Sequence, residues 1–138
     1  MASPKAFFDS NLLVYTDDPR FPKKLAIASG LIEKHLQDRT GAISIQVLQE
    51  YYSVTTGKLK TDPSVAREKA RIFSSLAVFR PAVEDVLAAI DLHRLHQLSF
   101  WDALIVRAAM QSGARILYAE DMQNGRRFDG IQIVNPFV

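Results

Sequence analysis

Four acidic residues stand out because each adjoins a hydrophobic segment: Asp9, Glu50, Asp102 and Asp121. Asp9 ends the apolar run 5–9, and Asp121 directly follows the apolar segment 114–120. Carboxylates that crowd together repel one another unless a cation neutralises them. Ligand sets made of oxygen alone favour Mg²⁺ or Mn²⁺, ions that serve phosphoryl chemistry above all. The four acids therefore predict a divalent-cation site, provided that the fold brings them together.

Asp102 is the most unusual of the four because it lies in FWDALIVRAAM, a segment that is apolar almost all round. On a helix it shares a face with Ile105, Val106 and Ala109, and no nearby basic residue falls on that face. An unpaired buried carboxylate costs on the order of several kcal/mol, so it needs donors, a cation or a raised pKa. The structural alternative is a capping box, since Ser99 stands three residues before Asp102.

The other acids also have structural alternatives. Asp9 can cap the turn that follows it, Glu50 can be a solvated helix acid, and Asp121 can be a turn residue beside Asn124 and Gly125. Two neutral side chains, those of Asn11 and Ser44, are candidates to add hydrogen bonds to the site or to begin helices.

The elements that must position these acids alternate between strands and helices. Helices are predicted over 22–38, from about 47 to Gly57, and over 63–76, 83–96 and 99–112. Strands are predicted over 5–9, 42–45, 76–81, 114–120 and 131–134. This alternation predicts an α/β fold with a parallel, five-stranded sheet flanked by helices. Ligands of such sheets bind outside the carboxyl ends of the strands, where Asp9 and Asp121 stand.

Composition narrows the possible classes of protein. The chain has 138 residues, 48% of them hydrophobic, which predicts a single domain over 1–138 with a full core. It contains no cysteine, so disulfides, thiolate metal sites and cysteine nucleophiles are excluded. A net charge of +2 permits contact with nucleic acid without arguing for it. Neither a membrane span nor a signal peptide is found, and we expect a cytoplasmic protein.

Other motifs are missing or weak. The spacing of the glycines gives neither a dinucleotide-binding nor a P-loop pattern, and no serine-hydrolase elbow is present. His93 and His96 have chelating spacing, but we expect a partly exposed surface pair because no third ligand is in view. A run of basic residues is either a phosphate-facing patch or, more commonly, a solvated helix face: Lys58, Lys60, Arg67, Lys69 and Arg71.

In the site that these residues predict, Asp9 and Asp102 would be the primary metal ligands. Asp121 would be a further ligand or a water-mediated contact. Glu50 would be a ligand or the residue that orients an attacking water. A bound ion would hold a scissile phosphate, lower the pKa of water and neutralise charge on the leaving oxygen.

At these residues the sequence resembles the PIN domain family, specifically the endoribonuclease toxins of VapC type. The matching segments are FFDSNLLVY at 7–15, ISIQVLQEYY at 43–52 and LSFWDALIVRAA at 98–109, followed by LYAEDMQNG and IVNPF near the end. Each segment alone is a weak signal. Their order and spacing across almost the whole chain make the resemblance specific.

The resemblance implies a three-layer, PIN-like fold, an acidic pocket for Mg²⁺ or Mn²⁺, and cleavage of single-stranded or looped RNA. The family's acids match the four already named, and its small polar residues after the first acid match Ser10 and Asn11. Glu120, beside Asp121, is an alternative fourth acid. The resemblance also implies a cognate antitoxin protein that blocks the pocket, and a homodimer.

Two rival functions use the same acids differently. A phosphotransfer domain would form an aspartyl phosphate on Asp9, but a haloacid-dehalogenase site would need a second aspartate where Asn11 stands. A receiver domain would have an acidic pair near the first strand and a lysine after the last one, where LYAED offers acids. A non-enzymatic module that binds RNA or protein would keep the acids for structure, and Asp102→Asn would then leave its function intact.

Overall fold

Six strands form one sheet, in the order β3-β2-β1-β4-β6-β5. The computed structural model describes residues 5–138. All neighbouring strands pair in parallel except β5 and β6, which are antiparallel. The strand bounds are β1 Ala6–Phe8, β2 Gly41–Ser44, β3 Ala77–Phe79, β4 Ile116–Tyr118, β5 Arg127–Phe128 and β6 Ile131–Val134.

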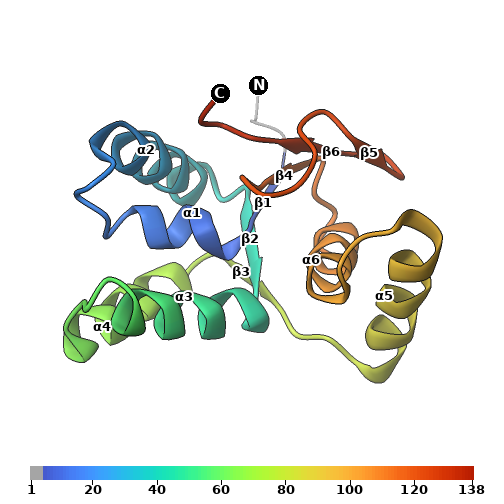
Figure 1. The fold of residues 1–138 in the computed structure, drawn as a ribbon, viewed down its shortest axis with the longest axis horizontal. Coiled ribbons are helices and arrows are strands. Elements are labelled where there is room, and N and C mark those ends of the chain that lie inside the picture. Colours follow the sequence, from blue (N-terminus) through green and yellow to red (C-terminus); the bar gives the residue numbers. More distant parts are fainter. Residues whose placement is uncertain (1–4) are drawn as a thin grey trace.

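Six helices flank this sheet in the part of the chain that the structure describes. Their bounds are α1 Ser10–Tyr15, α2 Pro22–Asp38, α3 Ile45–Gly57, α4 Pro63–Phe73, α5 Val83–His96 and α6 Phe100–Gln111. Figure 1 shows α1 to α4 gathered to one side of the sheet and α5 and α6 to the other. The result is the three-layer α/β architecture expected from the alternation of elements.

The core lies on both faces of the central strands. Every residue of β1 and β2 is buried, as are Leu117 of β4 and Ile133 of β6. Burial on both faces is typical of parallel strands that helices cover from two sides. It explains why these strands appear in the sequence as short continuous apolar runs without alternation.

Local signals in the sequence set the helix ends. Asp62 caps α4 by accepting a hydrogen bond from the Ser64 amide at 2.8 Å, and Pro63 follows it at the first helical position. Ser99 caps α6, and its hydroxyl accepts from the Asp102 amide at 3.1 Å. Pro22 opens α2 in the same way as Pro63 opens α4.

The sequence-based elements are largely confirmed, with two omissions. Helices 22–38 and 83–96 and strand 131–134 have the predicted bounds. The predicted helix 63–76 ends earlier, at Phe73, because the chain turns before entering β3. The prediction of five strands was wrong by one, since β5 adds a two-residue antiparallel strand where turn residues dominate the sequence. The sequence analysis also missed α1, a helix of six residues that begins directly after β1.

The strand order creates a crevice at the edge of the sheet. The chain moves outward from β1 to β2 and β3, and then returns to place β4 on the opposite side of β1. Connections on the two sides of β1 therefore diverge beyond the carboxyl ends of β1 and β4. Within residues 5–138, no helix has the length and apolar character needed to cross a membrane.

Candidate active site

Asp9 lies at the centre of this crevice and is the most buried of the four acids. The chain leaves β1 at this residue, whose amide donates to the Tyr118 carbonyl of β4 at 3.0 Å. Its carboxylate caps α1 by accepting from the Ser10 amide at 2.7 Å. Burial raises the pKa of Asp9 to about 7, and the negative charges of Glu50, Asp102 and Asp121 add to the rise against the Ser10 hydrogen bond.

Glu50 reaches the same place from α3. This helix follows β2, and Ser44 begins it by accepting from the Val47 amide at 3.3 Å. The pKa of Glu50 is raised, mainly by burial and also by the charge of Asp102, while hydrogen bonds with Gln46 and Ser10 oppose the rise. The side chain of Glu50 is intermediate in exposure and lines the same cavity as the other acids, which favours a place in the site over a fully solvated helix acid.

Asp102 enters from the first turn of α6. The Ser99 cap is present, but the structure records no hydrogen bond from the Ser99 amide back to the Asp102 carboxylate, as a full capping box would have. Burial raises the pKa of Asp102, as does the nearby charge of Asp121, while a hydrogen bond with the Ser99 side chain lowers it. Ile105, Val106 and Ala109 are buried, as the sequence pattern predicted.

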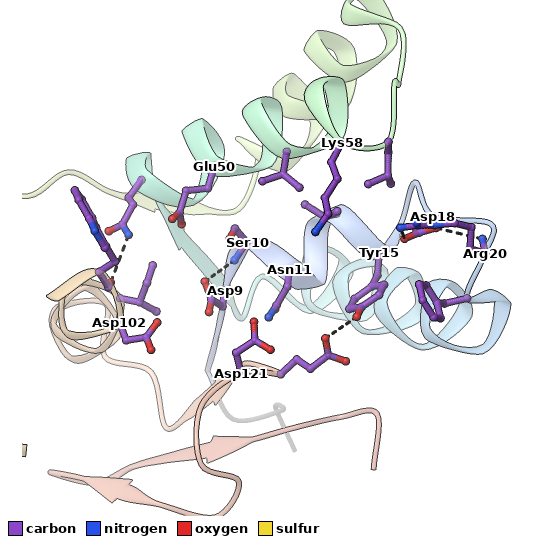
Figure 2. A pocket seen from close by; sticks show the side chains of 18 residues that line it. Asp9, Ser10, Asn11, Tyr15, Asp18, Arg20, Glu50, Lys58, Asp102 and Asp121 are labelled. Carbon is purple, nitrogen blue, oxygen red and sulfur yellow. Dashed lines mark hydrogen bonds and ion pairs between the residues drawn. The ribbon is translucent and has the colours of Figure 1, made fainter. Parts of the chain in front are cut away.

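Asp121 completes the group from the loop after β4. Figure 2 shows its carboxylate directed toward Asn11 and Asp9, with Asp102 and Glu50 reaching in from α6 and α3. Asn11 lies on the first turn of α1, and its Oδ1 atom is buried without a hydrogen-bond partner. An orphaned acceptor of this kind, beside four carboxylates, suits a donor or a cation and not another acid.

These side chains line one cavity of about 570 Å³. All four predicted acids line it, together with Ser10, Asn11 and Glu120. Ser44 does not, so its predicted supporting role is not borne out by its position. Its hydroxyl serves as the cap of α3, and the side chain is buried away from the cavity.

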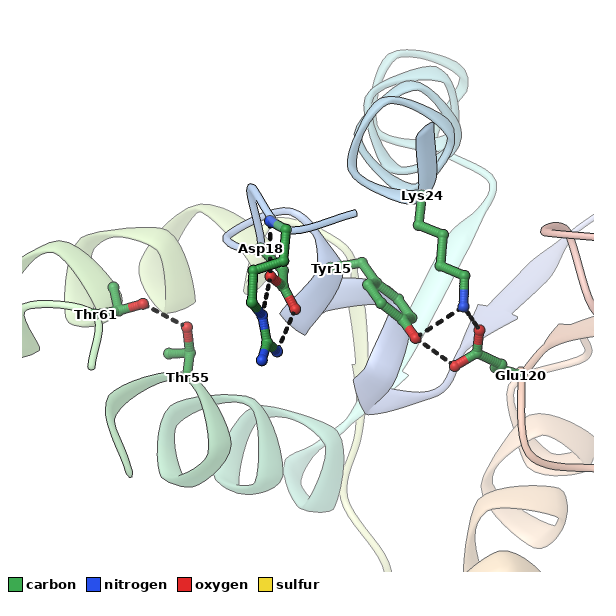
Figure 3. Close-up of polar contacts among 7 residues, drawn as sticks. Tyr15, Asp18, Lys24, Thr55, Thr61 and Glu120 are labelled. Carbon is green, nitrogen blue, oxygen red and sulfur yellow. Dashed lines mark hydrogen bonds and ion pairs between the residues drawn. The ribbon is translucent and has the colours of Figure 1, made fainter. Parts of the chain in front are cut away.

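Glu120 lines the cavity but turns away from the other acids. Its carboxylate accepts from the Tyr15 hydroxyl at 2.5 Å and pairs with the Lys24 ammonium at 2.5 Å (Figure 3). Both residues lie in a bend after β4. Figure 2 shows the Asp121 carboxylate directed toward Asp9.

The group formed by Asp9, Glu50, Asp102 and Asp121, the sheet-edge acids, lacks basic partners. Among residues 5–138, none of the sheet-edge acids forms an ion pair. Two basic side chains nearby are engaged elsewhere: Arg20 holds Asp18 through two hydrogen bonds of 2.9 Å, and Lys24 holds Glu120. Lys58 also lines the cavity but forms no ion pair with any of the sheet-edge acids. The fold thus gathers four carboxyl groups at the crevice without forming, in the described part of the chain, an ion pair to any of them.

The donor set suits a hard divalent cation. It consists of carboxylate oxygens, the orphaned Asn11 amide oxygen and the Ser10 hydroxyl, with neither sulfur nor imidazole. Among the described residues, no group of three or more histidine or acidic side chains is placed so that it could hold a metal ion. Magnesium keeps several of its water ligands in proteins, so an ion bound here would be held by fewer than three of these side chains and by water.

The predicted basic patch divides into separate roles. Lys69 pairs with Asp17, and Arg71 pairs with Glu68 one helical turn away at 2.5 Å. Lys58 lines the cavity, whereas Lys60 does not. His93 and His96 are exposed on α5, as expected for a surface pair. The run as a whole is therefore not one phosphate-facing surface.

A comparison with protein families decides the identity of the fold. The model of the PIN domain family matches residues 6–128. The chain belongs to the PIN domain family. Its membership confirms the resemblance seen in the sequence, supports a nuclease activity in general, and favours a nuclease over the phosphotransfer alternative.

The PIN fold is also seen in a solved structure. Mycobacterium tuberculosis VapC20, described as a toxin that cleaves the sarcin-ricin loop, superposes with a TM-score of 0.66 over 85% of this chain and 90% of that chain. The sequences are 18% identical, so the match shows a shared fold. A comparison with curated protein sequences gives no match.

Trp101 and Lys58 are among the lining residues that the sequence did not assign to the acidic site, although Lys58 belongs to the basic run that was a candidate phosphate-facing patch. Trp101 lies on the rim beside Asp102 and is 63% exposed. Lys58 follows α3 and faces the cavity from the end opposite Asp102 (Figure 2). A tryptophan next to an acid in the sequence is a possible signal for a binding site. The apolar sequence around Trp101 predicts a buried side chain, however, so the signal was not used.

Proposed function

We propose that this PIN domain is an endoribonuclease that uses Mg²⁺ or Mn²⁺ to cleave RNA phosphodiester bonds with water as the nucleophile. One observation carries the proposal: four carboxylates from four separate elements converge on one cavity, and among residues 5–138 none of them forms an ion pair. Such an arrangement costs stability unless a cation binds there. PIN family membership and the PIN fold of a toxin that cleaves RNA support the choice of substrate.

In this proposal Asp9 and Asp102 hold the ion directly, and Asp121 holds it through water. When bound, the ion would lower the pKa of a water and offset negative charge on the phosphoryl oxygens. Glu50 orients the attacking water by accepting a hydrogen bond from it. The water oxygen forms a bond to phosphorus and loses a proton to solvent as the bond to the leaving ribose oxygen breaks, and the leaving oxygen takes a proton from solvent. Ser10 and Asn11 line the same cavity and are placed to hydrogen-bond the phosphate or the waters around it.

A cleavage assay tests this function. Purified protein is incubated with a mixture of structured and single-stranded RNAs in Mg²⁺, in Mn²⁺ and in EDTA. We expect cleavage that requires the metal and that Asp102→Asn abolishes while the affinity for RNA changes little. RNA binding without cleavage in either metal would instead support the binding-module alternative.

The chain is also proposed to act as the toxin of a toxin–antitoxin pair and to form a homodimer in the cytoplasm. An apolar stripe on α5 supports a protein interface, because Val83, Val86, Leu87 and Ile90 fall at helical spacing and are between 37% and 71% exposed. Light scattering on the purified protein, compared with Leu87→Glu, tests the dimer. A monomeric wild type would contradict it.

Co-expression with the protein encoded beside this chain tests the antitoxin, which we expect to suppress cleavage.

A further inference from the structure

The two ends of the cavity carry different chemistry. At one end Asp102 and Trp101 project from the first turn of α6. At the other end lie Tyr15 and Lys58, beyond the sheet-edge acids (Figure 2). Phe21 also lines the cavity, and its ring meets that of Tyr15 edge-on. A strand of nucleic acid whose phosphate reaches Asp9 must continue past one or both of these ends. The residues there decide how the strand is held.

Lys58 is the available cation at its end of the cavity. It stands at the C-cap position of α3, and Figure 2 shows its amino group directed from α3 toward α1. Among the described residues it forms no ion pair, whereas Arg20, which also lines the cavity, is held by Asp18. The Arg20 hydrogen bonds lower the pKa of Asp18, and the charge of Lys58 lowers it further, so a phosphate bound by Lys58 would compete with this attraction and with no ion pair.

Trp101 offers a different kind of contact at the other end. The residue is 63% exposed although it adjoins a half-buried acid. Its backbone is tied to α3, since the Gln46 amide donates to the Trp101 carbonyl at 3.4 Å. Its ring meets Phe100 edge-on, with centroids 5.3 Å apart. An exposed indole fixed beside a phosphate-cleaving centre is a platform on which a base can stack.

The sheet-edge acids explain why both anchors are needed. Unneutralised carboxylates repel RNA phosphates, so a bound metal offsets part of the repulsion and affinity must come from elsewhere. Base stacking on an aromatic ring does not depend on the negative charge of the acids, and the positive charge of Lys58 counteracts that negative charge. These contacts carry no information about base identity beyond stacking strength.

We propose that single-stranded RNA crosses the sheet-edge acids between two anchors, with one base stacked on Trp101 and a phosphate on the opposite side bound by Lys58. This proposal rests on the proposed ribonuclease function and deepens it by giving the path of the substrate. Because stacking needs an unpaired base, a blunt duplex cannot satisfy the Trp101 contact, and we expect it to bind more weakly than a single strand.

The test measures RNA binding without cleavage. Fluorescence anisotropy of a short, mixed-sequence, single-stranded RNA is recorded with Mg²⁺ in an Asp102→Asn background, over a series of salt concentrations. We expect Lys58→Gln to weaken binding and to reduce the slope of log K against log salt by about 0.7, the value for one phosphate contact on a single strand. Lys60→Gln, which removes the same charge outside the cavity, should leave the slope unchanged.

Loss of the Trp101 contact should change the affinity for RNA without changing its salt dependence, unlike loss of the Lys58 contact. Trp101→Ala should weaken binding by roughly tenfold with no change in the salt slope, and Trp101→Phe should restore most of the loss. Ile72→Ala, at an exposed apolar residue of α4 outside the cavity, is the control. Equal effects of Lys58→Gln and Lys60→Gln, or an unchanged affinity in Trp101→Ala, would overturn the path. If one of these two results is found and the wild type still cleaves RNA, the proposed RNA path is wrong but the proposed ribonuclease function stands. If the wild type neither binds nor cleaves RNA, the proposed ribonuclease function is wrong as well.

Discussion

Acids around the cavity fall into two groups that differ in what neutralises them. Asp17, Asp18 and Glu120 pair with Lys69, Arg20 and Lys24, respectively. The sheet-edge acids Asp9, Glu50, Asp102 and Asp121 have no such partner among the described residues. Both groups lie within the same fold, so the second group does not lack partners for want of basic residues. The difference shows which carboxylates stabilise the fold and which are kept available for a ligand.

The first turns of α5 and α6 repeat this contrast on a smaller scale. Asp85 and Asp102 each occupy the third position of their helix. Asp85 accepts from the Ala82 amide at 2.8 Å and from Arg107 at 3.0 Å, and both contacts hold its pKa below the usual value. Burial raises the pKa of Asp102 instead. The same position in a helix therefore supports a structural acid in one case and an available one in the other.

The largest expected effect comes from removing a sheet-edge acid. Asp9→Asn and Asp102→Asn should each lower metal-dependent RNA cleavage by more than ~100-fold, because each substitution removes a proposed metal ligand. A residue that only supports a metal ligand costs less than this when it is replaced. Glu120→Gln, which alters a paired acid in the same cavity, is the matched control. Cleavage rates in saturating Mn²⁺ measure the difference. Comparable losses in all three variants would erase the distinction between the two groups.

A second prediction concerns the stability of the metal-free protein. The pKa of Asp9 is raised to about 7 from 3.8, so the folded state holds its proton more tightly than the unfolded state. The resulting stability is fully present below about pH 4 and is lost as the pH rises through 7. In EDTA the wild type should therefore be less stable at pH 8 than at pH 5, by up to ~3 kcal/mol from this residue, because about two pH units separate pH 5 from the folded pKa.

Asp9→Asn checks this prediction. Urea unfolding at both pH values should show a flatter pH dependence in the variant and greater stability than the wild type at pH 8. Adding Mn²⁺ should stabilise the wild type and leave the variant almost unchanged. An equally steep pH dependence in the variant would place the titrating group elsewhere.

Breaking an ion pair of Asp17, Asp18 or Glu120 should destabilise the protein, whereas Asp9→Asn should stabilise it at pH 8. Asp17 is held by Lys69 and accepts hydrogen bonds from Tyr51 and Thr55, each at 2.7 Å. Lys69→Met removes the cation and leaves a nearly buried carboxylate, which should destabilise the protein by about 1–3 kcal/mol at neutral pH. Metal affinity should not change. A Lys69→Met variant that is more stable than the wild type would show that the Lys69–Asp17 ion pair stabilises the fold no more than an apolar contact does.

The smallest effect is expected at Glu120. Its contacts with Tyr15 and Lys24 are partly exposed, so Glu120→Gln should change the free energy of unfolding by less than ~1 kcal/mol. Mn²⁺ affinity should change by less than about threefold, since the carboxylate points away from Asp9. A large loss of metal binding would identify Glu120 as the fourth acid of the site in place of Asp121.

Much of this organisation was predictable from the sequence because helix spacing and caps are local signals. The long helices followed from apolar periodicity, and the central strands followed from short continuous apolar runs. Asp9 and Asp121 followed from their positions after strands, and Asp102 from its place in an almost wholly apolar helix. The six-residue α1 was missed because it is shorter than two full turns of apolar pattern and has Asp9 as its cap. Strand β5 was missed because Arg127 and Phe128 pair with β6 within a segment of turn residues.

Contacts between distant residues were beyond the reach of the sequence. Glu120 is separated from Tyr15 by 105 residues, and nothing in the local pattern shows that their side chains meet. The inward direction of Lys58 depends in the same way on how α3 packs beside α1. Ser44 was ambiguous because a serine after a strand suits both a cap and a site, and only the fold shows that its hydroxyl is used by Val47.

Direct binding of Mn²⁺ in the absence of RNA tests the central claim without relying on the choice of substrate. Isothermal titration calorimetry at pH 8, where Asp9 is deprotonated, compares the wild type, the double variant Asp9→Asn with Asp102→Asn, and Glu120→Gln. We predict saturable binding in the wild type and in Glu120→Gln, and its loss in the double variant. Binding that survives in the double variant, or that is missing from the wild type, would contradict the assignment of the sheet-edge acids as a metal site.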